Sequence, residues 1–259
     1  MNFGTKTSDA LVSLPADTLT RSRDTRPQVR ILLADGTELA GPLASISLDR
    51  VNEWAPRRAW RWYRDQRHYP GFYWCATTGG HVGYESLLER DRLVLADFDP
   101  AVTNIKSQPF LMTMSDASGR MRHIPDYLLI HRTTPPRLVN VKTPEAADGE
   151  KAQRVFACVE QAATSRNWDA EVWTGADALY LANVHFLAGF RRERLIDKNV
   201  LSDVLAAAAP DLSLREVERR SGHPKDVARP AVMHAVWTHR ITIDLEDPLQ
   251  PSSAVVACR

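Results

Sequence analysis

The order of apolar and polar residues predicts a hairpin near the start of the chain and a helix before residue 100. The stretches Val29–Leu33 and Thr37–Leu48 suit strands on either side of Asp35-Gly36, a dipeptide that favours tight hairpin turns. Apolar residues then recur at helical spacing over 84–97, and Asp99-Pro100 follows. This spacing predicts one amphipathic helix that ends before the proline.

The middle of the chain predicts a mixed sheet. Three apolar runs separated by polar turns predict strands over 108–114, 122–131 and 137–142. The next elements expected are a helix, a short buried strand and a second helix, over 150–166, 170–173 and 177–190. An antiparallel hairpin would thus lead into a β-α-β crossover, which predicts an α/β fold with helices on the faces of the sheet.

The last third predicts a small separate domain. Helices are expected over 201–209, 214–220 and 230–238, and strands over 240–245 and 254–257. Ser213 followed by Glu216 forms a capping box that would open the second helix. Proline is tolerated in a first helical turn, so Pro230 is expected to begin the third helix. Three helices followed by two strands are typical of a winged helix-turn-helix domain.

Composition narrows the class of protein without identifying it. Hydrophobic residues make up 44% and charged residues 25% of the 259 residues, which is typical of a globular chain with a packed core. The net charge of +1 gives no overall attraction to nucleic acid, so any such affinity must come from local patches. The N-terminus lacks the apolar segment of a signal peptide, and no apolar run is long enough to span a bilayer. With three scattered cysteines, a cytoplasmic protein without membrane contact is expected.

The residues that indicate chemistry lie on the second and third of the three central strands. Asp126 precedes one apolar run, and the next run ends in Asn140-Val141-Lys142. Strand residues two apart point to the same side, so adjacent strands would bring Asp126, Asn140 and Lys142 together. An acid and a lysine arranged this way are typical of metal-dependent PD-(D/E)xK nucleases.

The same pattern predicts a magnesium site, with Mn²⁺ as a substitute. Mg²⁺ prefers hard oxygen ligands and needs only one or two carboxylates, because it keeps several waters. The helix over 84–97 supplies the second carboxylate: Glu89 is the candidate, and Glu85, one turn away, is the alternative. Asn140 and the backbone carbonyl of Val141 are further candidate ligands. We therefore expect Glu89, Asp126 and Lys142 to be catalytic.

The predicted organisation has four parts. Residues 1–26 would be a flexible leader, and residues 27–80 would form N-terminal strands and a basic-aromatic arm. Residues 81–195 would form a restriction-endonuclease-like mixed sheet flanked by helices. Residues 196–259 would form the winged-helix-like domain.

Two regions could contact DNA. In the stretch 54–74, tryptophans alternate with arginines that could neutralise phosphates, and the candidates are Arg57, Arg58, Arg61 and Arg64. The alternative is a structural arm whose tryptophans pack on the core while the arginines reach solvent. Gln108 could also touch DNA, or it could make a hydrogen bond at the start of a strand. The helix over 230–238 is not basic, so it could dock on a protein as well as on DNA.

Several motifs resemble the TnsA family, the endonuclease subunit of heteromeric cut-and-paste transposons. They are 69–79, Tyr84–Asp91, Asp97–Pro100, Gln108–Phe110, His123–Tyr127 and Val139–Lys142. The resemblance implies that the glutamate of a Ser-x-x-Glu motif, here Glu89 after Ser86, is catalytic together with Asp126 and Lys142. Asn140 stands where most PD-(D/E)xK nucleases have an acid, although the family tolerates a neutral glutamine there. We therefore expect weaker metal affinity than at a three-carboxylate site.

The resemblance also implies a function and partners. The chain would be a DNA endonuclease that hydrolyses phosphodiester bonds at the 5′ ends of a transposon during excision. Its partners would be double-stranded DNA at the transposon ends, a DDE-type transposase subunit and an AAA+ ATPase regulator. Two alternatives remain open: a stand-alone PD-(D/E)xK nuclease of defence or repair, and a non-catalytic DNA-binding assembly protein with the same fold.

Overall fold

The computed structural model describes residues 12–13, 26–58 and 69–258. Most of the predicted leader, together with Trp60, Trp62, Arg61 and Arg64, lies outside these residues. The chain divides into two compact units. The first contains residues 1–73, 82–89 and 103–174, and the second contains residues 74–81, 90–102 and 175–259.

The first unit contains a six-stranded antiparallel sheet. Its strands are β1 (Val12–Ser13), β2 (Gln28–Leu33), β3 (Glu38–Pro42), β4 (Trp54–Ala55), β8 (Leu111–Asp116) and β9 (Gly119–His123). They follow the order β1-β3-β2-β8-β9, and β4 also pairs with β2. The predicted hairpin around Asp35-Gly36 is confirmed, because β2 and β3 pair antiparallel and Gly36 has a left-handed φ of 87°. Short 3₁₀ turns occupy Leu43–Ser45 and Val51–Glu53.

A second sheet of four strands carries the candidate site. Its order is β12 (Asp169–Trp173), β11 (Arg137–Val141), β10 (Tyr127–His131) and β7 (Val102–Ser107). The pair β10–β11 is antiparallel and the pair β11–β12 is parallel, so the predicted hairpin and β-α-β crossover are confirmed. The sheet is mixed, as an α/β fold of this order requires.

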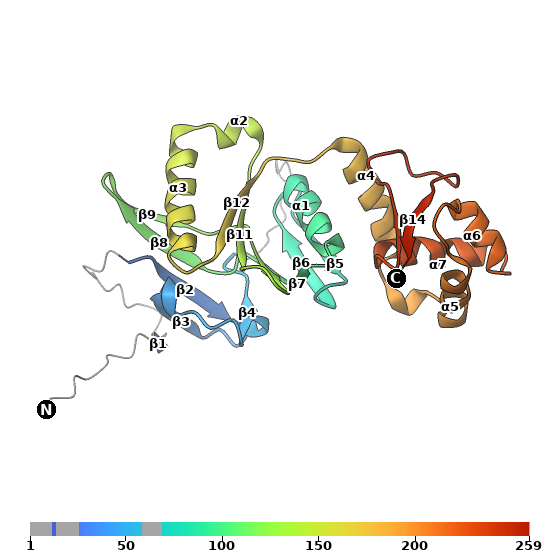
Figure 1. Ribbon diagram of the computed structural model, residues 1–259. Coiled ribbons are helices and arrows are strands. Elements are labelled where there is room, and N and C mark those ends of the chain that lie inside the picture. The colour runs from blue at the N-terminus through green and yellow to red at the C-terminus, as the bar shows by residue number, and fades with distance from the viewer. Residues whose placement is uncertain (1–11, 14–25, 59–68, 259) are drawn as a thin grey trace, which may run out of the picture. The chain divides into compact units, whose positions relative to one another are not determined.

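Helix α3 joins the two sheets of this unit through one apolar core. It spans Glu150–Thr164, after the short α2 (Pro144–Ala147), and Figure 1 shows it lying against β8 and β12. Its buried face, which includes Val159 and Ala163, packs in one cluster with Ile31 of β2, Met112 of β8 and Leu128 of β10. Burial of this apolar surface, worth ~25 cal/mol per Å², holds the strands of the site in place.

Four predicted strands differ from the observed ones. The strand expected over 37–48 is β3, which ends at Pro42, where the 3₁₀ turn Leu43–Ser45 follows. The single strand expected over 122–131 is two strands in different sheets, because Pro125 has no N–H to continue a ladder. The strand expected from Gln108 begins at Leu111, since Gln108 itself has a left-handed φ of 46°. The strand over 170–173 was expected to be buried, but β12 is a sheet edge and Val172 is 39% exposed.

Five strands were not predicted. Two are β1, which lies in the predicted flexible leader but pairs with β3, and β4, which pairs with β2. Another is β7, whose buried residues do not alternate regularly. The other two are β5 (Gly71–Cys75) and β6 (Gly80–Tyr84), which pair with each other. The helix expected over 84–97 is α1, Leu87–Phe98; it starts one turn later because β6 runs through Tyr84.

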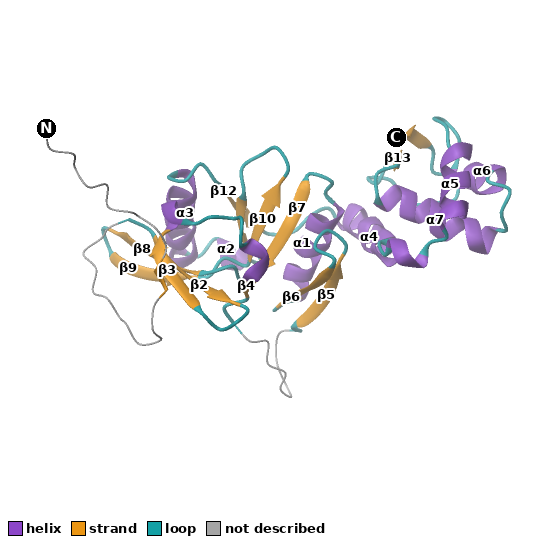
Figure 2. Cartoon of the chain, turned by 90° about the horizontal axis from the view of Figure 1, so that it is seen from below, coloured by secondary structure: helices purple, strands orange, loops and turns teal. Residues whose placement is uncertain are grey.

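The second unit contains the C-terminal helices and a small hairpin. Besides most of α1 and part of the β5–β6 hairpin, it contains the helices α4 (Ala178–Leu187), α5 (Lys198–Ala207), α6 (Leu214–Arg220) and α7 (Lys225–Trp237). Its C-terminal strands are β13 (Ile241–Ile243) and β14 (Val255–Cys258). Short 3₁₀ turns lie at Ala188–Phe190 and Glu193–Leu195. Figure 2 shows α5 and α6 close to α7. Because α7 begins at Lys225, Pro230 lies inside the helix rather than in its first turn, which corrects the expected start.

Among the described residues, no helix has both the length and the apolarity needed to cross a bilayer.

The capping box at α6 gives a direct test of local stability. The Ser213 hydroxyl accepts from the Glu216 amide, and the Glu216 carboxylate accepts from the Ser213 amide. Ser213→Ala should therefore lower the free energy of unfolding by about 1 kcal/mol, measured by urea denaturation. Ser202→Ala, at an exposed position of α5, is the control and should change stability by less than half as much. Equal effects of the two substitutions would contradict the role of the cap.

Candidate functional site

The candidate site is centred on the antiparallel pair β10–β11. The backbone N–H of Asp126 donates to the carbonyl of Val139 at 2.9 Å, so the ladder starts one residue before β10. Continuing the register of Tyr127 with Val139 sets Asp126 opposite Asn140. The structure thus brings Asp126, Asn140 and Lys142 together, as expected from the sequence.

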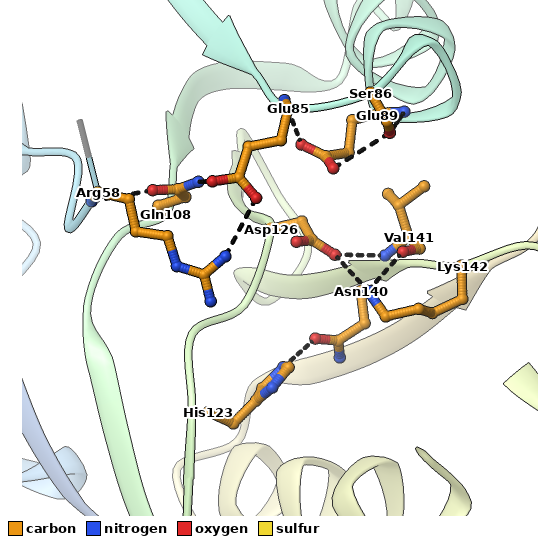
Figure 3. Close-up of polar contacts among 10 residues, drawn as sticks. All are labelled: Arg58, Glu85, Ser86, Glu89, Gln108, His123, Asp126, Asn140, Val141 and Lys142. Carbon is orange, nitrogen blue, oxygen red and sulfur yellow. Dashed lines mark hydrogen bonds and ion pairs between the residues drawn. The ribbon is translucent and has the colours of Figure 1, made fainter. Parts of the chain in front are cut away.

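The Asp126 carboxylate is held by the neighbouring strand. Its Oδ2 accepts from the backbone N–H of Val141 at 2.7 Å and lies 3.8 Å from the Lys142 ammonium nitrogen. The Lys142 Nζ donates to the Val141 carbonyl at 2.9 Å. Within the described part of the chain no hydrogen bond reaches Oδ1 of Asp126, so this oxygen is available to a ligand (Figure 3).

Glu89 enters the site from the first turn of α1. Its Oε2 accepts from the Glu85 amide at 2.8 Å, and the Ser86 hydroxyl donates to its Oε1 at 3.2 Å while accepting from the Glu89 amide. These bonds resemble a capping box, so the Ser-x-x-Glu motif also begins the helix. The Tyr127 hydroxyl donates to the Glu89 carbonyl at 3.2 Å, which fastens this turn to β10.

Burial and nearby acidic charge raise the pKa values of both carboxylates. Burial raises the pKa of Glu89 to about 7, and the nearby charge of Asp126 adds to the effect. Burial also raises the pKa of Asp126, while Lys142 and the Val141 N–H act in the opposite direction. Two acids whose charged forms are disfavoured by burial form the environment that a cation would stabilise.

Asn140 is buried and paired with His123. Its Oδ1 lies 2.5 Å from Nε2 of the histidine, and the residue is only 1% exposed. Burial lowers the pKa of His123, although the bond to Asn140 opposes that shift. His123 was not among the predicted site residues, and its place directly before Ile124-Pro125-Asp126 is the signal that could have indicated it.

The alternative carboxylate, Glu85, is directed elsewhere. Its Oε1 accepts from Nε2 of Gln108 at 2.8 Å, and its Oε2 accepts from the Arg58 guanidinium at 3.1 Å. Figure 3 shows this carboxylate pointing toward Arg58 and Gln108. Between the two glutamates, Glu89 is therefore the better candidate ligand beside Asp126.

The predicted DNA-binding residues occupy different environments. Arg57 is largely buried against Glu38 at 2.5 Å, so it is committed to an ion pair. Gln108 is 3% exposed and both ends of its amide are bonded inside the protein, so the hydrogen-bonding alternative fits it and direct DNA contact does not. Of the candidates that the structure describes, Arg58 is half exposed beside the site. Trp54 packs edge-on against Phe110 in the core, as expected of a structural arm.

The donor set fits a hard divalent cation such as Mg²⁺. No group of three or more His, Cys, Asp or Glu side chains suited to a metal occurs in the described ranges. Mg²⁺ needs fewer protein ligands than that, and the two carboxylates with raised pKa values supply the charge. Glu89, Asp126 through Oδ1 and the Val141 carbonyl are the oxygens that could hold it. The Asn140 oxygen is paired with His123.

No protein-family model and no curated protein matches this sequence. Function must therefore be inferred from the site itself.

The raised pKa of Glu89 predicts a pH-dependent stability. Between pH 4.5, the ordinary pKa, and about 7, the folded chain keeps a proton that the unfolded chain loses, so folding becomes less favourable as pH rises. Glu89→Gln keeps an oxygen for the Glu85 amide but removes the charge. In metal-free buffer it should stabilise the chain by on the order of 3 kcal/mol above pH 7, and the gain should vanish near pH 4.5.

Urea denaturation across this pH range measures the effect. Glu160→Gln, at an exposed position of α3, is the matched control. A gain from Glu89→Gln that is independent of pH would contradict the assigned environment of the carboxylate.

Proposed function

We propose that this protein is a metal-dependent DNA endonuclease of the PD-(D/E)xK class. The observation that carries the proposal is the convergence of Glu89, Asp126 and Lys142. They come from the start of α1, the start of β10 and the end of β11, and Lys142 lies 3.8 Å from the Asp126 carboxylate. Hydrolysis of a phosphodiester needs these groups: acidic oxygens for a divalent ion, and a cation near the reacting phosphate.

The roles of the side chains follow from their surroundings. Glu89 and Asp126 would hold Mg²⁺, or Mn²⁺ in its place, which when bound supplies Lewis acidity and an acidified water. The Val141 N–H holds one oxygen of Asp126 and leaves the other for the ion. Lys142 would orient the attacking water and stabilise negative charge on the phosphorane. Asn140, held by His123, would complete the wall of the site without adding charge.

The sequence motifs support a narrower proposal. We infer a TnsA-like subunit of a heteromeric transposase that cleaves double-stranded DNA at the 5′ ends of the transposon. A DDE-type transposase subunit and an AAA+ ATPase would be its partners, and a cytoplasmic location follows from that role. The segment α5–α6–α7–β13–β14 has the element order of a winged helix-turn-helix domain, which would serve DNA or partner docking.

Two observations favour a non-catalytic alternative. Glu89 has a structural role as the acceptor that begins α1, and Asn140 replaces the usual acid. A DNA-binding assembly protein with this fold would need Glu89 for its helix and would need no third acid at position 140. Metal binding separates the two functions and does not depend on partner proteins.

Metal affinity should depend on both carboxylates. In a calorimetric titration with Mn²⁺, Glu89→Gln and Asp126→Asn should each weaken binding by roughly tenfold or more, because each removes a charged oxygen ligand. Asn140→Asp should strengthen binding, since it adds a third carboxylate. Titration curves that are the same for all four proteins would favour the assembly protein.

Catalysis should depend on Asp126 and Lys142. With Mg²⁺ and a duplex substrate, Asp126→Asn and Lys142→Ala should reduce strand cleavage by roughly 100-fold or more while circular dichroism stays unchanged. Lys151→Ala, at an exposed position of α3, is the control and should cleave normally. The assay includes the partner transposase subunit if the chain alone is inactive. Wild-type cleavage by both site variants would exclude this site.

A further inference from the structure

One buried residue connects three segments around the site. The backbone N–H of Gln108 donates to the Asp126 carbonyl at 2.8 Å, and its own carbonyl accepts from the Arg57 amide at 3.1 Å. Its side-chain Oε1 accepts from the Arg58 amide at 3.0 Å, and Nε2 donates to Glu85 at 2.8 Å. Gln108 therefore fixes Arg57–Arg58 and Glu85 relative to Asp126.

The backbone of Gln108 is strained, which indicates that its position matters. Its φ of 46° is a left-handed conformation that costs energy for a residue with a side chain. The residue is 3% exposed, so hydrogen bonds to solvent do not compensate for this backbone strain. The hydrogen bonds to three segments are what the strained conformation makes possible.

The result of this arrangement is an arginine at the rim of the site. The Arg58 side chain is 54% exposed and lies 3.1 Å from Glu85. Burial is the main cause of the lowered pKa of His123, and Arg58 contributes in the same direction, so its charge reaches the histidine that holds Asn140. Figure 3 shows the guanidinium on the same side of Asp126 as His123. Arg57, in contrast, is turned into its ion pair with Glu38.

We propose that Arg58 binds a backbone phosphate of the DNA next to the scissile bond. Gln108 positions Arg58 for this contact, and Glu85 pairs with the Arg58 guanidinium when DNA is absent. This inference rests on the proposed nuclease function. A guanidinium matches the geometry of a phosphate and can donate two parallel hydrogen bonds to it.

Glu85 is suited to be displaced by the DNA. The ion pair it makes is half exposed and has one contact, and exposed pairs of this kind are weak. A phosphate that replaces Glu85 on Arg58 meets repulsion from this carboxylate, because Gln108 still holds the other Glu85 oxygen nearby. Glu85 therefore opposes DNA binding and gives way to it.

DNA affinity tests the proposal without cleavage. The full chain is titrated against a fluorescein-labelled duplex of mixed sequence in EDTA, and anisotropy is measured at several salt concentrations. Arg58→Gln should weaken binding by about tenfold and reduce the salt slope by about 1. Glu85→Gln should strengthen binding several-fold. Arg50→Gln, which breaks the exposed pair with Glu53, is the matched control and should bind like the wild type.

A double-substitution experiment separates positioning from general structure. Gln108→Ala should weaken DNA binding when Arg58 is present and have no further effect in Arg58→Gln, because both act through one contact. Equal losses in the two backgrounds would show that Gln108 has a structural role alone, and wild-type affinity of Arg58→Gln would overturn the proposal.

The DNA-affinity experiment and the tests of nuclease function can fail separately. If the wild-type chain itself fails to bind the duplex, the assignment of Arg58 is overturned, whereas Mn²⁺ titration still tests the metal site. If binding follows the prediction but Asp126→Asn cleaves normally, the nuclease site is wrong and the DNA contact stands.

Discussion

The pairing of β10 with β11 is the interaction on which the rest of the site depends. The Asp126 amide extends the ladder to Val139, and the Val141 amide returns a hydrogen bond to the Asp126 carboxylate. The acid is therefore held by its backbone and by its side chain through the same neighbouring strand. Because Leu128 and Leu138 of these strands are fully buried in the core, a shift in register would expose apolar surface and separate the acid from Lys142 at once.

The electrostatics of the site oppose the stability of the fold. Burial raises the pKa values of Glu89 and Asp126, so their charged forms are costly near neutral pH, and Lys142 is too exposed to offset both. Sites with this imbalance are characteristic of function, because a bound cation or substrate supplies the missing charge. The strained Gln108 is a second cost in the same place, and both costs lie beside Asp126.

Glu89 illustrates how a structural and a chemical role can share one side chain. Its carboxylate accepts hydrogen bonds from the Glu85 amide and the Ser86 hydroxyl at the start of α1. Burial, with the nearby charge of Asp126, raises its pKa. A Ser-x-x-Glu pattern alone is therefore weak evidence for a catalytic acid, since helices commonly begin this way. Burial and the nearby Asp126 distinguish this glutamate from Glu216, whose pKa is lowered by its capping bonds with Ser213.

Local patterns in the sequence are enough to predict the elements with clear periodicity and the residues on them. The hairpin at Asp35-Gly36, the crossover through α3 and the cap at Ser213 depend on local turn, spacing and capping preferences, which act over a few residues. Asp126, Asn140 and Lys142 could be predicted to meet because strand alternation fixes which residues share a face. Two features emerge only in the folded chain: Pro125 divides one apolar run between two sheets, and Gln108 holds Arg58 and Glu85 beside the site. Those features depend on contacts between residues far apart in the chain, where long-range packing and hydrogen bonding outweigh local preference.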